Sequence, residues 1–233
     1  MTTFLLDYDG TLCDTLPAIS ATVQAVFLEF DQPAPPAQEI QALVGTGKTL
    51  QDTLLTLASQ HAPERLAQLP DWVAAYRSRY RDFQNQVELF PGVRETLAAL
   101  HGNARLVLLS NKSEQAIYAS LRHFELERYF DRILADSEGQ PSKPDIRVFT
   151  HRLLSWLPDL KPSECIMVGD TASDLQFAKN IGARACYAQY GYGSESECKE
   201  IGYDHALERF DDLPAIPEYC VYFKGPNPVT DSG

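Results

Sequence analysis

Two aspartates near the start of the chain have the types and spacing needed for phosphoryl transfer. Asp7 and Asp9 follow the apolar run Phe4-Leu5-Leu6 and are separated by one residue. One carboxylate can attack a phosphorus atom while the other gives a proton to the departing oxygen. Gly10 lets the chain turn sharply and brings backbone N–H groups close to a phosphate. Taken alone, the same residues also fit an acidic turn without chemistry.

Two further segments have side chains that could bind a phosphate group. Ser110 and Asn111 end an apolar run, where a hydroxyl and exposed N–H groups at a helix start could bind a phosphate oxygen. A helix N-cap is the alternative for Ser110. Lys143 precedes a proline and a predicted helix start, so its ammonium could offset the charge of phosphate and aspartate. The alternative for Lys143 is a surface lysine in a loop.

Another pair of aspartates could hold a metal ion. Asp170 closes an apolar run, and Asp174 lies one turn into the helix predicted after it. Magnesium prefers a few carboxylates combined with waters and substrate phosphate. Asp7 and Asp170 could therefore be direct ligands of the metal, and Asp174 could lie just outside the direct ligands. Helix capping is the alternative for these acids, and it explains one of them more readily than both.

The elements that must position these residues are short apolar runs that alternate with helical patterns. Runs that suit buried parallel strands lie at 4–6, 106–109, 133–135, 166–168 and 183–187. Helical patterns lie at 93–100, 113–124, 145–157 and 172–181. This alternation predicts an α/β fold with a doubly wound, mostly parallel, Rossmann-like sheet. Ligands bind beyond the carboxyl ends of the strands in such sheets, so the motifs should converge at one edge.

The interval between the first two runs is far longer than one crossover helix requires. It spans about 90 residues, with helical patterns at 16–30, 37–43, 49–59 and 70–84. The excess predicts an inserted all-helical cap domain at 16–84. The α/β core would then comprise 1–15 and 85–215. Residues 216–233 would form a C-terminal extension with a mobile end, which is rich in Pro, Gly, Asn, Asp and Ser.

Composition narrows the classes of partner. The chain has 233 residues and a net charge of −12, which argues against nucleic acid or an anionic membrane as a partner. The same charge repels phosphate esters, so a phosphate site would need a cation or a few placed lysines. The chain shows no signal peptide, no membrane-spanning run and no CxxC pair among five cysteines. We expect a reduced, cytoplasmic protein that is a monomer or a homodimer.

The order of the motifs resembles that of the haloacid dehalogenase-like superfamily. Asp-x-Asp-Gly-Thr at 7–11 is followed by Ser110-Asn111, Lys143-Pro144 and Gly169-Asp170-x-x-x-Asp174, each after an apolar run. The insertion lies where this superfamily carries a helical cap. The resemblance covers 1–15 and about 86–190.

The resemblance implies a role for each motif. Asp7 would be the nucleophile and Asp9 the general acid/base. The phosphate would be bound by Gly10, Thr11, Ser110, Asn111 and Lys143. The Mg²⁺ ion would be held by Asp7, Asp170, Asp174 and the backbone carbonyl of Asp9.

Differences between members of the superfamily at these motifs indicate which reaction this chain would catalyse. Dehalogenases differ at the position of Asp9, because an alkyl halide needs no leaving-group proton, and phosphonate-cleaving relatives lack that acid. Phosphosugar mutases share both aspartates, so a mutase stays open, as does a non-catalytic binding protein with the same fold. Ser110-Asn111-Lys112 and Val44-Gly45-Thr46-Gly47 are similar to motifs of phosphoglycolate phosphatase-like members. The implied function is Mg²⁺-dependent hydrolysis of a small phosphate ester, such as 2-phosphoglycolate, through an aspartyl-phosphate.

A competing motif lies within the predicted cap. Gly45-Thr46-Gly47-Lys48-Thr49 looks like the end of a nucleotide-binding phosphate loop. That motif needs a glycine at position 42, which is Ala42, and a preceding strand, whereas 39–44 has a helical pattern. We expect a cap loop over the active site instead, in which Lys48 meets a substrate carboxylate. A flexible exposed turn is the alternative.

Overall fold

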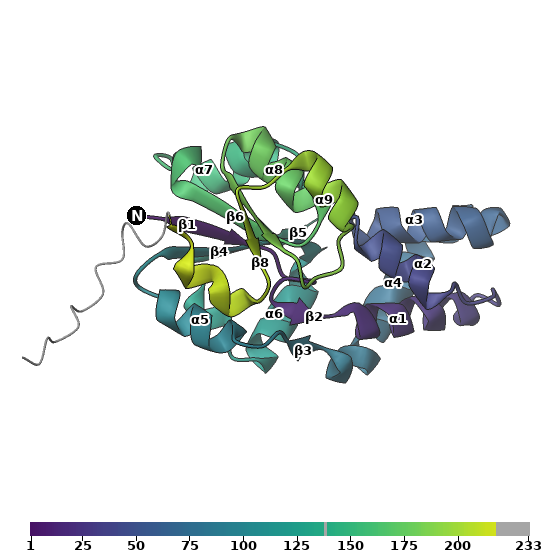
Figure 1. Ribbon diagram of the computed structural model, residues 1–233. Coiled ribbons are helices and arrows are strands. Elements are labelled where there is room, and N and C mark those ends of the chain that lie inside the picture. The colour runs from purple at the N-terminus through teal and green to yellow at the C-terminus, as the bar shows by residue number, and fades with distance from the viewer. Residues whose placement is uncertain (138, 218–233) are drawn as a thin grey trace, which may run out of the picture.

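The computed structural model describes residues 1–137 and 139–217, and a six-stranded parallel sheet lies at the centre of the molecule (Figure 1). The strand order is β5-β4-β1-β6-β7-β8. The strands are β1 (Thr3–Leu6), β4 (Arg105–Ser113), β5 (Arg132–Asp136), β6 (Cys165–Gly169), β7 (Arg184–Ala188) and β8 (His205–Leu207). The first five coincide with the five predicted apolar runs, which confirms the α/β fold class. The short edge strand β8 was missed, because only Leu207 of its three residues is buried.

The register of the three central strands places their carboxyl ends at one level. Leu6 lies opposite Leu108 of β4 and opposite Val168 of β6. The chain therefore leaves β1 and β6 at neighbouring points, and β4 becomes irregular beyond Leu109. This alignment carries the predicted motifs to the same edge of the sheet.

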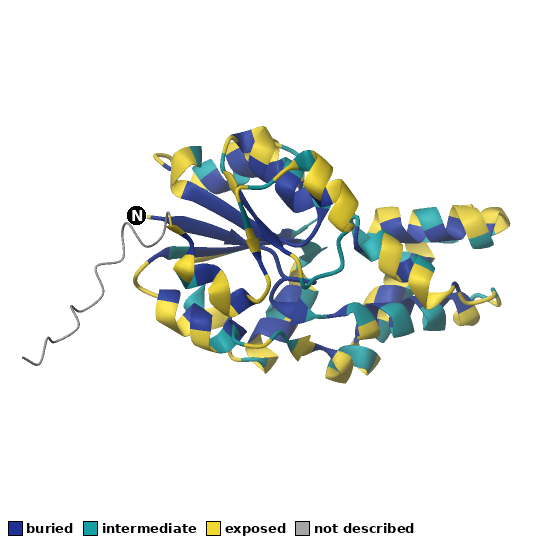
Figure 2. Ribbon diagram, viewed as in Figure 1, coloured by how far each residue is buried: buried dark blue, intermediate teal, exposed yellow. Residues whose placement is uncertain are grey.

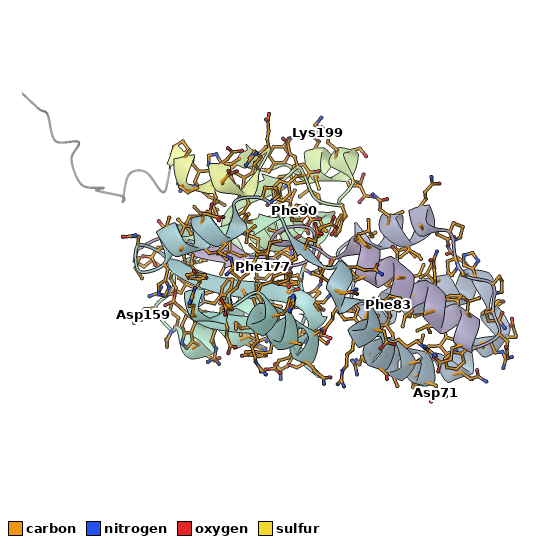
Figure 3. All side chains as sticks on the ribbon, turned by 90° about the horizontal axis from the view of Figure 1, so that it is seen from below. Asp71, Phe83, Phe90, Asp159, Phe177 and Lys199 are labelled. Carbon is orange, nitrogen blue, oxygen red and sulfur yellow. The ribbon has the colours of Figure 1, made fainter. Side chains whose placement is uncertain are left out.

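Helices cover both faces of the sheet, because successive side chains of its strands point to opposite faces. Phe4 and Leu6 belong to one apolar cluster, and Leu5 between them belongs to another. Figure 2 shows most strands of the sheet in dark blue, as buried, with helices on either side. The first cluster includes side chains of α5 (Val93–Leu100) and α6 (Glu114–His123). The second includes residues of α8 (Ala172–Ile181) and α9 (Glu195–Ile201), with Phe177 labelled in Figure 3.

Most predicted helices of the core form within a residue or two of their predicted bounds. The pattern at 145–157 is an exception, because a π-helical segment, η4 (Val148–Leu153), continues into α7 (Leu154–Trp156). Its start is delayed because Asp145 makes a local turn, in which its carboxylate accepts the backbone N–H of Arg147 at 2.8 Å. The remaining short 3₁₀ segments of the core are η3 (Glu127–Tyr129), η5 (Pro162–Glu164) and η6 (Phe210–Ala215).

All four helices predicted in the insertion form, and they project beyond one end of the sheet (Figure 1). They are α1 (Leu16–Glu29), α2 (Ala37–Val44), α3 (Leu50–His61) and α4 (Leu69–Arg79), with η1 (Pro63–Gln68) before α4 and η2 (Tyr80–Gln86) after it. We call this group the cap. Figure 3 labels Asp71 on the cap and Asp159 on the core, toward the opposite end of the molecule.

A two-stranded ribbon joins the cap to the core. β2 (Cys13–Asp14) pairs antiparallel with β3 (Glu88–Leu89), so the chain leaves and returns at one place. This ribbon was not predicted, because two-residue strands show no periodicity. The division at 16 and 84 stays a prediction, and the ribbon lies just outside those limits.

Some sequence-based predictions concern residues at the end of the chain. The predicted mobile end at 224–233, and Cys220, lie outside the described residues. The other four cysteines are buried, and none of them forms a disulfide with another described residue. Within the described parts of the chain, no helix combines the length and apolar character needed to cross a membrane.

The cap has its own apolar contacts, centred on Phe27 of α1 and Trp72 of α4. Both side chains are fully buried, and their rings meet edge to face with centroids 4.7 Å apart. The indole N–H of Trp72 is buried without a hydrogen-bond partner among the described residues. The contribution of Trp72 therefore comes from ring packing.

We expect Trp72→Ala to lower the free energy of unfolding by about 3–5 kcal/mol, because a cavity replaces the indole ring. Trp72→Phe should cost far less, since it keeps an aromatic ring and loses no hydrogen bond. Urea unfolding of both variants, followed by circular dichroism, measures the difference. Equal stabilities of the two variants would show that the ring does not hold α1 and α4 together.

Candidate active site

Three aspartates from two loops meet at the carboxyl edge of the sheet. Asp7 directly follows β1, and its backbone N–H donates to the carbonyl of Val168 at 2.9 Å. Asp170 follows β6, and Asp174 lies in the first turn of α8. All three aspartates are buried, and their carboxylate oxygens lie within 4.8 Å of one another. The sheet thus brings together residues that are more than 160 positions apart.

Lys143 lies among these carboxylates. Its Nζ is 2.8 Å from an Asp7 oxygen and 2.6 Å from an Asp174 oxygen, and its side chain is only 2% exposed. Asn111 holds the backbone of Lys143 from both sides. Its side-chain oxygen accepts the Lys143 N–H at 2.9 Å, and its amide group donates to the Lys143 carbonyl at 3.0 Å. The surface-lysine alternative is therefore wrong.

Hydrogen bonds from the protein fix the orientation of the other two carboxylates. Asp174 accepts the backbone N–H of Thr171 at 3.0 Å and its hydroxyl at 2.6 Å, so it caps α8 while also facing Lys143. Asp170 accepts the hydroxyl of Thr11 at 3.0 Å and the backbone N–H of Tyr192 at 2.8 Å. Thr11 thus orients a carboxylate, and its predicted contact with phosphate stays a prediction.

Charge in the cluster is unbalanced, with three carboxylates against one ammonium. Burial and the nearby Asp174 raise the pKa of Asp7 to about 7, although Lys143 opposes this shift. Burial, Asp174 and Asp7 raise the pKa of Asp170 well above its usual value. A divalent cation would relieve this repulsion, and carboxylate oxygens are ligands that Mg²⁺ prefers. The donor set therefore fits the predicted metal.

Asp9 lies apart from the cluster, in a different environment. One of its oxygens is 2.9 Å from the Nζ of Lys112, and its side chain is 21% exposed. The Lys112 ammonium lies 4.5 Å from the centroid of the Tyr80 ring in the cap. Burial opposes the charge of Lys112, but Asp9 and Tyr80 raise its pKa well above the usual value. The predicted role of the Asp9 carbonyl as a metal ligand stays a prediction.

Lys112 was not among the predicted site residues. Its sequence signal was its position directly after Ser110-Asn111, at the same strand end. Ser110 is buried, and its hydroxyl accepts the backbone N–H of Lys112 at 3.2 Å. The N-cap alternative for Ser110 is wrong, because α6 begins only at Glu114.

Gly10 is required by the close approach of two loops. Its φ is +76°, and a Cβ at this position would lie 2.2 Å from a carboxylate oxygen of Asp170. Any side chain here would push Asp170 out of the cluster. The glycine therefore shapes the aspartate cluster, whereas its predicted contact with phosphate stays a prediction.

The cap loop from Gly45 to Thr49 lies against the core. It follows helix α2 and not a strand, so the nucleotide-binding alternative lacks its structural context. The carbonyl of Gly47 accepts the side-chain amide of Asn111 at 2.9 Å, and a Cβ at Gly47 would lie 2.4 Å from the Thr171 hydroxyl. The hydroxyl of Thr46 turns back to its own loop and donates to the carbonyl of Leu43.

A cavity of about 690 Å³ lies between the cap and the core. Asp7, Asp9, Ser110 and Lys143 line it from the core, and Gly47 and Lys48 line it from the cap. Lys48 is exposed and lines this cavity, and its predicted contact with a substrate carboxylate stays a prediction.

Comparison with known proteins identifies the family. Residues 4–188 match the model of the haloacid dehalogenase-like hydrolase family. The chain belongs to this family.

Individual members of the haloacid dehalogenase-like hydrolases resemble the chain over most of its length. A plasmid-encoded phosphoglycolate phosphatase of Cupriavidus necator is 28% identical over 92% of each chain. A phosphoglycolate phosphatase of Nitrosospira multiformis is 29% identical over 86% of this chain and 88% of the relative. The structure of a haloacid dehalogenase-like hydrolase from Streptococcus pneumoniae superposes with a TM-score of 0.79 at 25% identity, covering 92% of this chain and 97% of that one.

Tyr192 links the aspartate cluster of this hydrolase to its cap. Its backbone N–H holds Asp170, while its phenol oxygen accepts the N–H groups of Thr15 at 2.6 Å and Leu16 at 3.0 Å. The phenol also donates to the carboxylate of Asp14 at 2.7 Å. The sequence alone does not indicate this contact, because it spans more than 170 positions.

The aspartate cluster should make the metal-free hydrolase sensitive to pH. The pKa of Asp7 is higher in the folded chain than in the unfolded one, so the folded state binds more protons between about pH 4 and 7. Stability from this group is therefore present at low pH and is lost as the pH rises through about 7.

We expect Asp7→Asn to raise the Tm of the metal-free hydrolase at pH 8, and the gain should shrink toward pH 4. The shift should be roughly 2–4 °C for each kcal/mol of repulsion removed. Differential scanning calorimetry in chelator measures it, and the exposed Asp159→Asn is the control. A lower Tm for Asp7→Asn at pH 8 would contradict the unbalanced charge of the cluster.

We expect Tyr192→Phe to leave the N–H groups of Thr15 and Leu16 without an acceptor. Their hydrogen exchange should become at least about tenfold faster, which corresponds to about 1.4 kcal/mol of lost protection. Tyr190→Phe is the matched control, since that hydroxyl donates to the carbonyl of Thr11. Unchanged exchange at residues 15 and 16 would show that the phenol does not hold the start of α1.

Proposed function

We propose that the protein is a Mg²⁺-dependent phosphomonoester hydrolase that acts on a small phosphorylated metabolite through an aspartyl-phosphate. The observation that carries this proposal is the difference between the surroundings of Asp7 and Asp9. Both line the cavity, but Asp7 is buried beside Lys143, whereas Asp9 is partly exposed beside Lys112. Two carboxylates in different environments can take the roles of nucleophile and general acid/base.

In the first step, a carboxylate oxygen of Asp7 attacks the phosphorus atom and the ester bond to the leaving oxygen breaks. Lys143 offsets the negative charge that otherwise keeps the phosphate away from Asp7. Asp9 gives its proton to the leaving oxygen, so that oxygen departs as a hydroxyl group and not as an alkoxide.

In the second step, water attacks the phosphorus atom of the aspartyl-phosphate. Asp9, now a carboxylate, takes a proton from this water, and the bond between phosphorus and Asp7 breaks. Free phosphate is released and both aspartates return to their first state. Mg²⁺ held by Asp7 and Asp170, with Asp174 beside them, would supply the positive charge that three carboxylates and a phosphate require.

The names of two relatives support a small anionic ester as the substrate. The relatives from Cupriavidus necator and Nitrosospira multiformis are named phosphoglycolate phosphatases, so 2-phosphoglycolate is one proposed substrate.

A cytoplasmic location, and a monomer or homodimer as the oligomeric state, stay part of the proposal. The four buried cysteines form no disulfide among the described residues, which supports a reducing compartment.

We expect Asp7→Asn to reduce phosphate release at least about 10³-fold, because the amide is a poor nucleophile. Asp9→Asn should reduce it by about 10²–10⁴-fold through loss of the acid/base. Release of inorganic phosphate from phenyl phosphate and 2-phosphoglycolate, with Mg²⁺ or with chelator, measures both effects. Asp159→Asn serves as the control for a lost surface carboxylate.

The products separate the proposed hydrolase from the alternatives. Normal turnover by Asp7→Asn would remove that residue as the nucleophile. Isomerisation of a hexose 1-phosphate without free phosphate would favour a phosphosugar mutase. Absence of turnover on every ester, with Mg²⁺ still bound, would favour a non-catalytic binding protein.

A further inference from the structure

The lining of the cavity carries positive charge that the proposed chemistry does not use, most of it on the cap. Apart from the residues of the catalytic centre and Lys112, its charged lining consists of Lys48, Arg77, Arg81 and Arg122 against Glu114. The chain as a whole has a net charge of −12. This excess of cations is therefore local, and it borders the space that a leaving group would occupy.

Two of these cations lie one helical turn apart on the last turn of α4 and the start of η2. Arg77 and Arg81 line the cavity, and both are exposed. Burial raises the pKa of Asp136, and the nearby charge of Arg77 opposes this shift. Arg79, between them, lies outside the cavity lining and binds Glu29 of α1. A basic last turn also favours a helix C-terminus, but this applies equally to Arg79 and does not explain why Arg77 and Arg81 line the cavity.

Two tyrosines complete the same wall. Tyr76 and Tyr80 are one turn apart, are largely buried and stack with ring centroids 5.8 Å apart. Tyr80 faces Lys112, which in turn contacts Asp9. The aromatic wall is thus linked through Lys112 to the proposed acid/base.

The cavity is also large for a two-carbon acid. Its volume of about 690 Å³ falls within the range of roughly 300–1,000 Å³ found for pockets that hold drug-sized ligands. Guanidinium groups bind carboxylate or phosphate through paired hydrogen bonds, and aromatic rings accept the flat or apolar part of a ligand.

We propose that the leaving group is larger than glycolate and carries a second anionic group, which Arg77 and Arg81 bind while its carbon skeleton lies against Tyr76 and Tyr80. The second anion is a carboxylate or a phosphate. This inference rests on the proposed hydrolase and specifies its substrate class. Arg77 and Arg81 are then specificity-determining residues.

The test compares esters that differ in one group. Phenyl phosphate, 4-carboxyphenyl phosphate and 1,4-phenylene bisphosphate share a ring, and 2-phosphoglycolate represents the two-carbon acid. We expect kcat/KM to be at least about tenfold higher for one of the ring esters with a second anion than for phenyl phosphate. Whichever of these two esters gains more identifies the second anion.

The double variant Arg77→Gln/Arg81→Gln should lose that advantage, by about ten- to a hundredfold in kcat/KM, and leave phenyl phosphate within about twofold. Arg79→Gln removes the same charge from the same helix and should keep the advantage. Three results would overturn the inference: no preference for a second anion, an equal loss on all esters in the double variant, or preferred turnover of 2-phosphoglycolate that does not depend on Arg77 and Arg81.

Binding to Asp7→Asn, measured by calorimetry with Mg²⁺, separates this inference from the proposed hydrolase. One outcome is that no ester is hydrolysed, but the doubly anionic ring ester binds more tightly and loses this preference in the arginine double variant. The proposed hydrolase activity is then rejected, and the proposed binding of a second anion by the arginines is supported. If phenyl phosphate is hydrolysed and binding shows no preference, the inference fails and the hydrolase stands.

Discussion

The ammonium of Lys143, enclosed between the carboxylates of Asp7 and Asp174, is the contact on which the active site depends. A buried charge is tolerated only when it is paired and hydrogen-bonded, and here one cation serves two acids while Asp170 lies beside them. Neighbouring side chains supply the hydrogen bonds that fix these charged groups. Asn111 fixes the lysine backbone from both sides, and Thr171 fixes Asp174. The negative charge that remains fits a divalent cation.

The same contacts tie the cap to the core. Asn111 reaches both the Lys143 loop and the carbonyl of Gly47 in the cap loop. Tyr192 reaches both Asp170 and the first N–H groups of α1. The groups that orient the carboxylates are therefore also groups that position the cap, and the cavity is defined by both parts together. Substitution of Asn111 or Tyr192 should therefore disturb both the orientation of the buried charged groups and the position of the cap.

Charge is divided within the cavity in a way that suits an acidic protein. The edge of the sheet is negative and would be neutralised by Mg²⁺, whereas Arg77 and Arg81 make the cap wall positive. A substrate with two anionic groups would meet a cation at each end. Lys112 lies between the two regions, because it contacts Asp9 of the core and faces Tyr80 of the cap. This division explains how a chain with a net charge of −12 can accept an anionic ester.

The sequence by itself determined the parallel sheet, the helical insertion and the ordered motifs of Asp7, Ser110, Lys143 and Asp170, because each is encoded in a short local pattern. Only the tertiary structure showed that Lys143 is buried between two acids, that Thr11 orients Asp170, and that Lys112 pairs with Asp9. It also gave contacts to Tyr192 and a place in the cavity lining to Arg81, neither of which a local pattern specifies. These contacts join residues far apart in the chain, and their partners are set by the packing of loops and cap against the sheet.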